Sequence, residues 1–242
     1  MRPLSAAELL AVWEKGLAAP AAERALLLLA AAYPDEAPQD LAQLSVGQRD
    51  GRLLALRATQ FGEQLDCMVP CPGCGEQLEL SFDIASIRTA PPPKQRRTIR
   101  LRRKGYDVRF RLPNSLDLLA LEPGDEAQMT LLQRCLRSAN LQGESISPGD
   151  LPDTIIRAIV ARMAQADPQA EIQVALSCPA CEHEWLSLFD IVSYLWSEIN
   201  TWAMRLLQDI HQLAMAYGWR EADILALSPW RRRIYLQMSS AL

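Results

Sequence analysis

The stretch LDCMVPCPGCGEQLELSFDI, residues 65–84, occurs a second time as IQVALSCPACEHEWLSLFDI, residues 172–191. In each copy, apolar and polar residues alternate before and after a Cys-Pro-x-Cys sequence, which predicts a β-hairpin with the two cysteines at its tip. The cysteines, the proline and the closing Phe-Asp-Ile all recur 107 residues later (Cys71 and Cys178, for example). This agreement indicates an internal duplication, in which each hairpin is one unit that needs the other.

The two cysteine pairs predict a metal site. A tight turn lets both thiolates of a pair point to one side, and two facing turns can surround one zinc ion at about 2.3 Å from each sulfur. Four thiolates fill the coordination sphere, so this zinc is expected to be structural and not catalytic. The 103 residues between the pairs are tolerable because closing a longer loop costs entropy only logarithmically. The predicted ligands are Cys71, Cys74, Cys178 and Cys181.

Other interpretations of the cysteines stay open. A thioredoxin-like redox pair, and with it a thiol oxidoreductase, is disfavoured because strands are predicted after both pairs. The thiols could also be unliganded, and His183 could replace a cysteine, although its place two residues beyond Cys181 favours a neighbour. Gly75 follows the first pair and adopts positive φ easily, whereas Glu182 stands at the matching place and predicts a looser second turn.

Composition narrows the class of protein. The chain has 242 residues and 27.0 kDa, with 49% apolar and 22% charged residues, which predicts a folded protein of up to two domains. It shows no signal-peptide pattern and no membrane-spanning stretch, so we expect a cytoplasmic protein with reduced thiols. With two histidines, no glycine-rich phosphate loop and no nucleophile elbow, we expect no enzymatic activity.

The periodicity predicts a mixed α+β fold: helical N- and C-terminal segments around a split zinc ribbon of two β-hairpins, with an inserted β-hairpin plus helices. Within the insertion we expect a hairpin over 98–112 and helices over 115–121, 126–138 and 153–163. One long helix over 190–217, capped by Gly218, and two shorter ones should follow. The predicted parts are residues 1–61 (N-terminal helical segment), 62–84 with 172–191 (split zinc ribbon), 85–171 (inserted hairpin-plus-helix module) and 192–242 (C-terminal helical segment).

Charge is distributed unevenly along the chain. The net charge is −4, but residues 94–111 hold nine basic side chains and a single acidic one, Asp107. This basic block has three interpretations: a solvated strand face, a contact with an anionic protein surface, or a nucleic-acid site in a zinc-ribbon module. A DNA-reading helix-turn-helix over 221–238 is disfavoured by the acidic pI of about 5.3. The candidate contacts of the block are Arg100, Arg102 and Arg103.

The C-terminal run IHQLAMAYGWREADILALSPWRRRIYL, residues 210–236, is similar to the ending of the baseplate hub assembly chaperones of contractile-tailed bacteriophages and related phage-tail-like injection systems. The paired hairpins resemble the zinc-ribbon members of that family. The resemblance covers mainly 171–238 and extends to the first hairpin and to 111–117. It implies an assembly chaperone or baseplate-associated factor that binds hub or spike proteins and has no catalytic residue. Because aromatic and arginine anchors dominate many interfaces, the candidate contacts are Trp219, Trp230, Arg231, Arg232 and Arg233.

Overall fold

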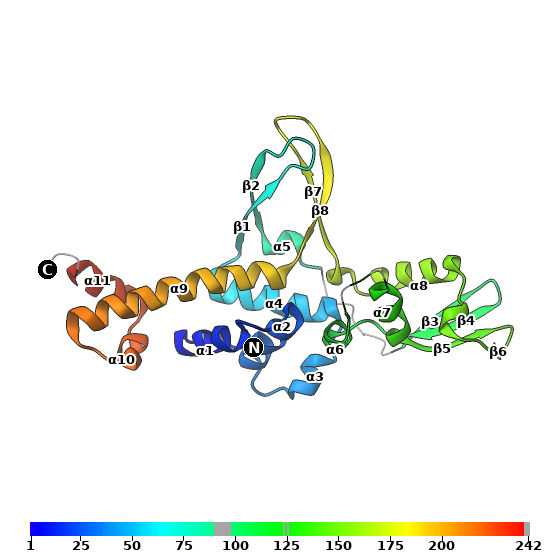
Figure 1. Ribbon diagram of the computed structural model, residues 1–242, viewed down its shortest axis with the longest axis horizontal. Coiled ribbons are helices and arrows are strands. Elements are labelled where there is room, and N and C mark those ends of the chain that lie inside the picture. Colours follow the sequence, from blue (N-terminus) through cyan, green and yellow to red (C-terminus); the bar gives the residue numbers. More distant parts are fainter. Residues whose placement is uncertain (90–97, 123, 125, 240–242) are drawn as a thin grey trace.

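The computed structural model describes residues 1–89, 98–122, 124 and 126–239 and has a mixed α+β fold, as predicted. Figure 1 shows a central helical body, a stalk of two hairpins rising from it, a module of strands and helices at one end, and a pair of short helices at the other. The helices of the N-terminal part are α1 (Ala6–Gly16), α2 (Ala21–Ala32), α3 (Pro38–Ala42) and α4 (Val46–Phe61).

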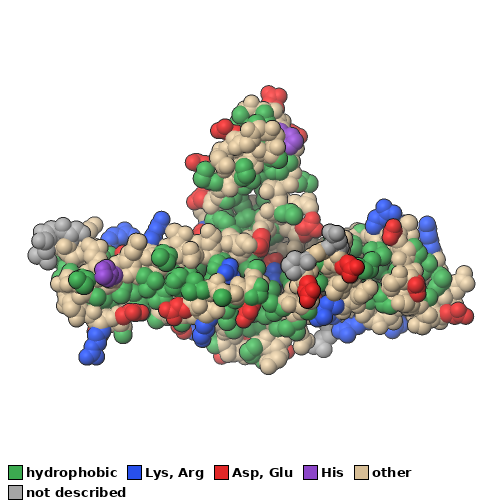
Figure 2. All heavy atoms as spheres, in the orientation of Figure 1, with side chains coloured by type: hydrophobic (Ala, Val, Ile, Leu, Met, Phe, Trp, Pro, Cys, Tyr) green, Lys and Arg blue, Asp and Glu red, His purple; other side chains and the backbone are tan. Residues whose placement is uncertain are grey.

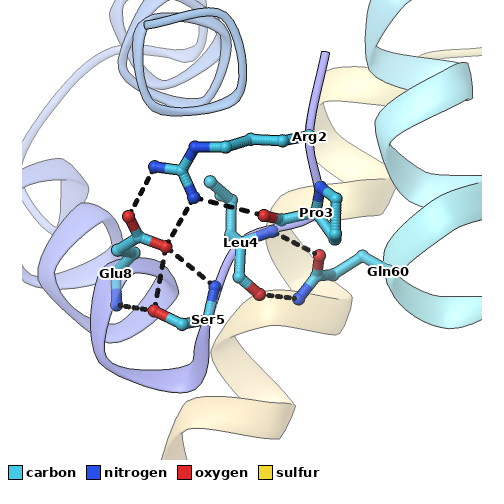
Figure 3. Close-up of polar contacts among 6 residues, drawn as sticks. All are labelled: Arg2, Pro3, Leu4, Ser5, Glu8 and Gln60. Atoms are coloured by element: carbon cyan, nitrogen blue, oxygen red, sulfur yellow. Dashed lines mark hydrogen bonds and ion pairs between the residues drawn. The ribbon is translucent and has the colours of Figure 1, made fainter.

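Side-chain caps fix the starts of two of these helices. Ser5 and Glu8 form a capping box at the start of α1, and Ser45 and Gln48 form a second one at the start of α4. Gln60, near the end of α4, accepts a hydrogen bond from the Leu4 amide at 3.1 Å and donates one to its carbonyl at 2.9 Å (Figure 3). The beginning of the chain is thereby tied to α4.

The long helix α9 (Ile191–Tyr217) begins at the second hairpin and crosses the body. Asp190 caps it by accepting a hydrogen bond from the Val192 amide, and Gly218 ends it in the left-handed conformation, as predicted. Its first half packs on α1, α2 and α4 and closes one apolar core. The largest fully buried side chains there include Leu9, Leu28, Leu29, Leu53, Leu54 and Ile191.

Two antiparallel hairpins form the stalk. They are β1 (Gln64–Pro70) with β2 (Gln77–Asp83), and β7 (Ile172–Ser177) with β8 (Glu184–Phe189). Their registers are equivalent: Leu65 pairs with Phe82 in the first hairpin, and Ile172 pairs with Phe189 in the second. The duplication seen in the sequence is therefore also present in the strand pairing. A short helix, α5 (Ile84–Ile87), follows the first hairpin where α9 follows the second.

The segment between the hairpins holds a four-stranded antiparallel sheet, where the sequence predicts a two-stranded hairpin. The helix predicted over 126–138 ends at Cys135, and the next residues form a strand that pairs with the edge of the predicted hairpin. This pairing satisfies backbone groups that a lone hairpin leaves open. The elements are β3 (Ile99–Arg103), β4 (Tyr106–Phe110), α6 (Ser115–Leu119), α7 (Ala127–Cys135), β5 (Leu136–Leu141), β6 (Glu144–Ser145) and α8 (Asp153–Ala166), with 3-10 turns at Pro148–Asp150 and Pro168–Ala170.

This module has its own apolar core and a polar joint to the helical body. One face of the sheet packs on α8 around Val108, Phe110 and Ile159. At the joint, the Val46 amide donates to the Pro113 carbonyl at 3.1 Å, and the Gly47 amide donates to the Asp167 carboxylate at 2.9 Å. The start of α4 is therefore hydrogen-bonded to the inserted module at two places, Pro113 and Asp167.

The second half of α9 packs against α10 (Glu221–Ala226) and α11 (Pro229–Ser239) at the far end of the body (Figure 1). A small third core lies between them around Leu206, Leu213 and Ile224. Both short helices fall where the sequence predicts them. Among the described residues, no helix combines the length and apolarity that crossing a membrane requires.

Candidate metal centre

The two Cys-Pro-x-Cys turns at the stalk tip have the same backbone geometry. In the first, the Gly75 amide donates to the Cys71 carbonyl at 2.8 Å; in the second, the Glu182 amide donates to the Cys178 carbonyl at 2.8 Å. The amides of Cys71 and Cys178 close the turns in return, by donating to the residue five positions later at 2.8 and 2.9 Å. Each turn thus holds its two sulfurs on one side.

The turns face one another and bring the four predicted ligands together. The Sγ atoms of Cys71 and Cys181 lie 3.6 Å apart, and those of Cys74 and Cys178 lie 3.7 Å apart. All four sulfurs lie within 4.8 Å of one another. Sulfurs bound tetrahedrally at about 2.3 Å from one zinc ion would be about 3.8 Å apart. The donor set and its spacing therefore fit a four-thiolate metal site.

The site is open on one side and apolar on the other. Cys71 and Cys178 are buried, whereas Cys74 and Cys181 are exposed. Leu78 and the half-buried ring of Trp185, which occupy equivalent places in the two hairpins, lie beneath the buried pair. This apolar layer shields the inner thiols from water.

The thiols strongly affect one another's ionisation. Desolvation opposes the thiolate of Cys71, but hydrogen bonds from backbone amides and neighbouring thiols lower its pKa to about 7. The amide of Glu76 favours the thiolate of Cys74, yet hydrogen bonding with Cys181 and the other thiols raises the pKa of Cys74 to about 12. Several thiolates in so small a space need a cation to compensate their charge.

The second turn is as tight as the first, so the expectation of a looser turn at Glu182 is wrong. Glu182 adopts a left-handed conformation with φ of 58°, matching Gly75 with φ of 80°. The hydrogen bonds that close the second turn hold a side-chain-bearing residue in a conformation that ordinarily costs about 1–2 kcal/mol. The hydrogen bonds of the turn itself thus override the conformational preference of Glu182.

The remaining candidate thiols and imidazole lie outside this cluster. His183 stacks on Trp185 with ring centroids 5.8 Å apart, as expected of a neighbour. Cys67 lies half-buried on β1, and Cys135 is buried at the end of α7. Burial raises the pKa of Cys135 to about 11. Among the described residues, the four predicted cysteines form the cluster of side chains that could hold a metal ion.

Among the described residues of the basic block, Arg100, Arg102 and Arg109 lie exposed on one face of the inserted sheet. The carboxylate of Asp107 binds both Arg100 and Arg102, the latter at 3.2 Å. Part of the positive charge of the basic block is therefore compensated within the sheet. Arg103 is exposed at the end of β3. Residues 94–97, which hold three further basic side chains of the block, lie outside the described part of the chain.

The C-terminal candidates divide between surface and interior. Trp230 is 70% exposed on α11, and Arg231 and Arg233 are exposed beside it. Arg232 is only 6% exposed and points to the α9 side, near Asp209. Trp219 is half-buried: its ring stacks on Tyr217 at 4.7 Å and meets Tyr235 edge to face at 4.8 Å. Trp219 therefore packs within this end of the molecule, and Arg232 is buried there instead of lying on the surface.

Sequence reasoning missed a buried ion-pair centre at the start of α6. The carboxylate of Asp117 is 1% exposed and binds Arg111 through both oxygens and Arg134 at 3.2 Å. Asp117 also caps α6 reciprocally with Asn114. The Asn-x-x-Asp spacing is the signal that could have revealed the cap. No local sequence pattern predicts the two arginine partners of Asp117, because Arg111 follows β4 and Arg134 lies on α7.

The comparisons with known proteins come from sequence families, curated proteins and solved structures. The family described as T4 bacteriophage base plate protein matches residues 20–196. That range includes α2 to α8, both hairpins and the beginning of α9. No curated protein and no solved structure matches the chain.

Proposed function

The chain belongs to the T4 bacteriophage base plate protein family, and on this premise we propose that it is a non-enzymatic, baseplate-associated assembly factor that binds hub or spike components of a contractile tail-like particle. The family supports a baseplate-related structural role. The assembly-chaperone role rests on the resemblance of residues 210–236, which lie beyond the matched range. We further propose that the protein acts in the cytoplasm, where such particles are built.

The observation that carries the proposal is the extent of the family match. It spans 177 of the 242 residues (20–196) and takes in both hairpins with everything between them. The cysteine cluster therefore lies within the matched part of the chain. A structural role agrees with a four-sulfur site, because four protein ligands leave no position for water or substrate.

We propose that the two hairpins form a split zinc ribbon and that zinc is the bound metal. When bound, the ion supplies positive charge for four thiolates, and the cysteines of the two hairpins hold it from opposite sides. Since one hairpin comes before the inserted module and the other after it, the site ties the two ends of that module together. We keep the division into 1–61, 62–84 with 172–191, 85–171 and 192–242 as part of this proposal.

For the hub or spike contact we propose the exposed end of the C-terminal helices, at Trp230, Arg231 and Arg233. An exposed aromatic ring flanked by arginines has the chemistry of an interface anchor. The test is a pull-down with purified hub and spike proteins encoded in the same gene cluster, at several salt concentrations. Trp230→Ala should weaken capture, and Met215→Ala, which removes another exposed apolar side chain from α9, should not. Failure to capture either protein at any salt concentration would overturn the proposal.

The alternative is a nucleic-acid-binding module that uses residues 94–111. The compensation of Arg100 and Arg102 by Asp107 weighs against it, because those guanidinium groups already have a carboxylate partner. Salt-dependent binding to a generic duplex or single strand, lost when Arg100, Arg102 and Arg103 are reversed in charge, would favour this alternative instead.

A further inference from the structure

The outward-facing surfaces of the two hairpins differ, although the hairpins are duplicates. On the second hairpin, Leu186 and Leu188 of β8 are 64% and 69% exposed. The equivalent places on β2 of the first hairpin hold Glu79 and Ser81. Two neighbouring leucines on the outer face of a two-stranded sheet make an apolar surface that the first hairpin lacks.

On the first hairpin, polar contacts occupy the outer face at Ser81 and the free edge of β1 at Asp66. The Ser81 hydroxyl donates to the Asp66 carboxylate at 2.6 Å and accepts from the Gln64 side chain at 2.8 Å. The Tyr194 hydroxyl covers the free edge of β1, because it accepts from the Asp66 amide and donates to the Asp66 carbonyl, both at 3.0 Å. A strand added at the edge of β1 would have to displace the contacts of Tyr194, and the outer face beside β2 offers Glu79 and Ser81 in place of the two leucines.

The second hairpin has an open edge. Among the described strands, β8 pairs with β7 alone. The Cys178 amide donates to the His183 carbonyl, and because antiparallel pairs alternate, the amides and carbonyls of Glu184, Leu186 and Leu188 point away from β7. No hydrogen bond joins them to any other described residue. Exposed leucines and free backbone groups thus lie on the same strand.

The stalk is also strongly acidic. Residues 63–83 and 171–190 contain nine Asp and Glu side chains and no Lys or Arg. On the face shown in Figure 2, the projecting stalk carries acidic and apolar side chains and a histidine, without Lys or Arg. A partner that lies along β8 would therefore meet an apolar strip in a negative surrounding, which attracts basic side chains.

We propose that the free edge and outer face of β8 bind an extended segment of a partner baseplate protein, one that alternates apolar side chains with Lys or Arg. Its backbone would pair with Glu184, Leu186 and Leu188, its apolar side chains would cover the two leucines, and its basic side chains would face the acidic stalk. This inference rests on the proposed function and names a second contact surface, separate from the C-terminal helices.

The test uses the full-length, zinc-loaded protein and a fluorescent nine-residue peptide that alternates Val and Lys. We expect saturable binding that weakens with salt and slows hydrogen exchange at the amides of Leu186 and Leu188. The double variant Leu186→Glu with Leu188→Ser, which places the first hairpin's residues on the second, should weaken binding at least tenfold. A purely electrostatic attachment would instead tighten, because the variant adds a negative charge.

The matched control is Met68→Glu, which, like Leu186→Glu, replaces an exposed apolar side chain by Glu. Met68 is 62% exposed on the outer face of the first hairpin. It should leave peptide affinity unchanged. Absence of binding, equal binding of a peptide that alternates Val and Glu, or an unchanged affinity in the double variant would each overturn the proposal. So would concentration-dependent self-association that the double variant abolishes, because the occupant would then be a second copy. If hub or spike proteins still bind the double variant with full affinity, the proposed function survives and this inference fails.

Discussion

The rings of Phe82 and Phe189, which end equivalent strands of the two hairpins, meet edge to face with their centroids 5.7 Å apart. Their cross-strand partners, Leu65 and Ile172, belong to the core of the helical body. The stalk is therefore held at two levels, by apolar packing at its base and by the cysteine cluster at its tip. The two levels should respond differently when metal is removed.

Removing the metal should loosen the stalk tip and leave the helical body folded. Four thiols that lose their cation repel one another when ionised, while the base keeps its apolar contacts. We expect about one zinc per chain by elemental analysis, and loss of it in Cys71→Ser and Cys178→Ser. Hydrogen exchange should rise around the two turns only. Cys67→Ser is the control, since Cys67 lies outside the cluster; zinc loss in that variant would contradict the assignment.

Exchanging the residue types at the two positive-φ positions of the tip, Gly75 and Glu182, should change zinc affinity in opposite directions. Gly75→Glu introduces a left-handed side-chain-bearing residue, at a cost of about 1 kcal/mol, and should weaken zinc binding about fivefold. Glu182→Gly relieves that strain and should strengthen binding by up to the same factor. Competition with a chelating indicator measures both. Gly143→Glu creates equal strain far from the metal; if it also weakened zinc binding, strain in the turns would not be the cause.

Gly47 and Gly51 lie one turn apart on α4 and should respond oppositely to alanine. A Cβ on Gly47 would lie 2.2 Å from the Asp167 carboxylate and 2.8 Å from the Ala170 amide nitrogen, so Gly47→Ala should destabilise by about 1–3 kcal/mol. A Cβ on Gly51 meets nothing closer than 3.8 Å, so Gly51→Ala should stabilise the helix by about 1 kcal/mol. Urea unfolding checks both, and equal effects would mean that the joint at Asp167 is not tight.

Because of Asp50, the free energy of unfolding should fall as the pH rises from about 4 to about 6. Burial raises the pKa of Asp50 to about 6, despite its 2.7 Å contact with Arg49. The folded state then holds a proton that the unfolded state releases near pH 4, so stability falls between pH 4 and 6 by up to about 3 kcal/mol. Asp50→Asn keeps an acceptor for Arg49 and should remove this fall. Urea unfolding at pH 4, 5 and 7 tests it, with the exposed Asp153→Asn as control; parallel curves for wild type and Asp50→Asn would contradict it.

Asp117 should have the opposite pH dependence. Although burial favours its neutral form, Arg111 and Arg134 hold the pKa of Asp117 below its ordinary value. Its contribution is present at neutral pH and is lost as pH falls below about 4. Asp117→Asn should cost about 1.5–3 kcal/mol at pH 7, because it removes the buried negative charge that Arg111 and Arg134 bind, and less at pH 3. Asp107→Asn, which also breaks arginine pairs but at a more exposed carboxylate, should have a smaller effect in the same unfolding assay.

Local sequence signals were sufficient wherever neighbouring residues decide the structure. The capping box of Ser5 and Glu8, the left-handed end of α9 at Gly218 and the alternation on either side of each cysteine pair all act within a few residues. The prediction failed at residues 136–138, which form part of a strand. The open edge of β4 supplies hydrogen bonds there that no helical pattern can anticipate.

The sequence by itself determined that two equivalent hairpins exist and which four thiols they carry, because the duplication repeats the cysteines, the proline between them and the alternation of the flanking strands. Only the tertiary structure decided that the tips face one another with sulfurs 3.6 and 3.7 Å apart. It also decided that Arg232 is buried while Trp230 is exposed, and that Arg111 and Arg134 meet at Asp117. The physical reason is that these relations join residues from separate elements, whose approach depends on how the cores pack and not on any local pattern.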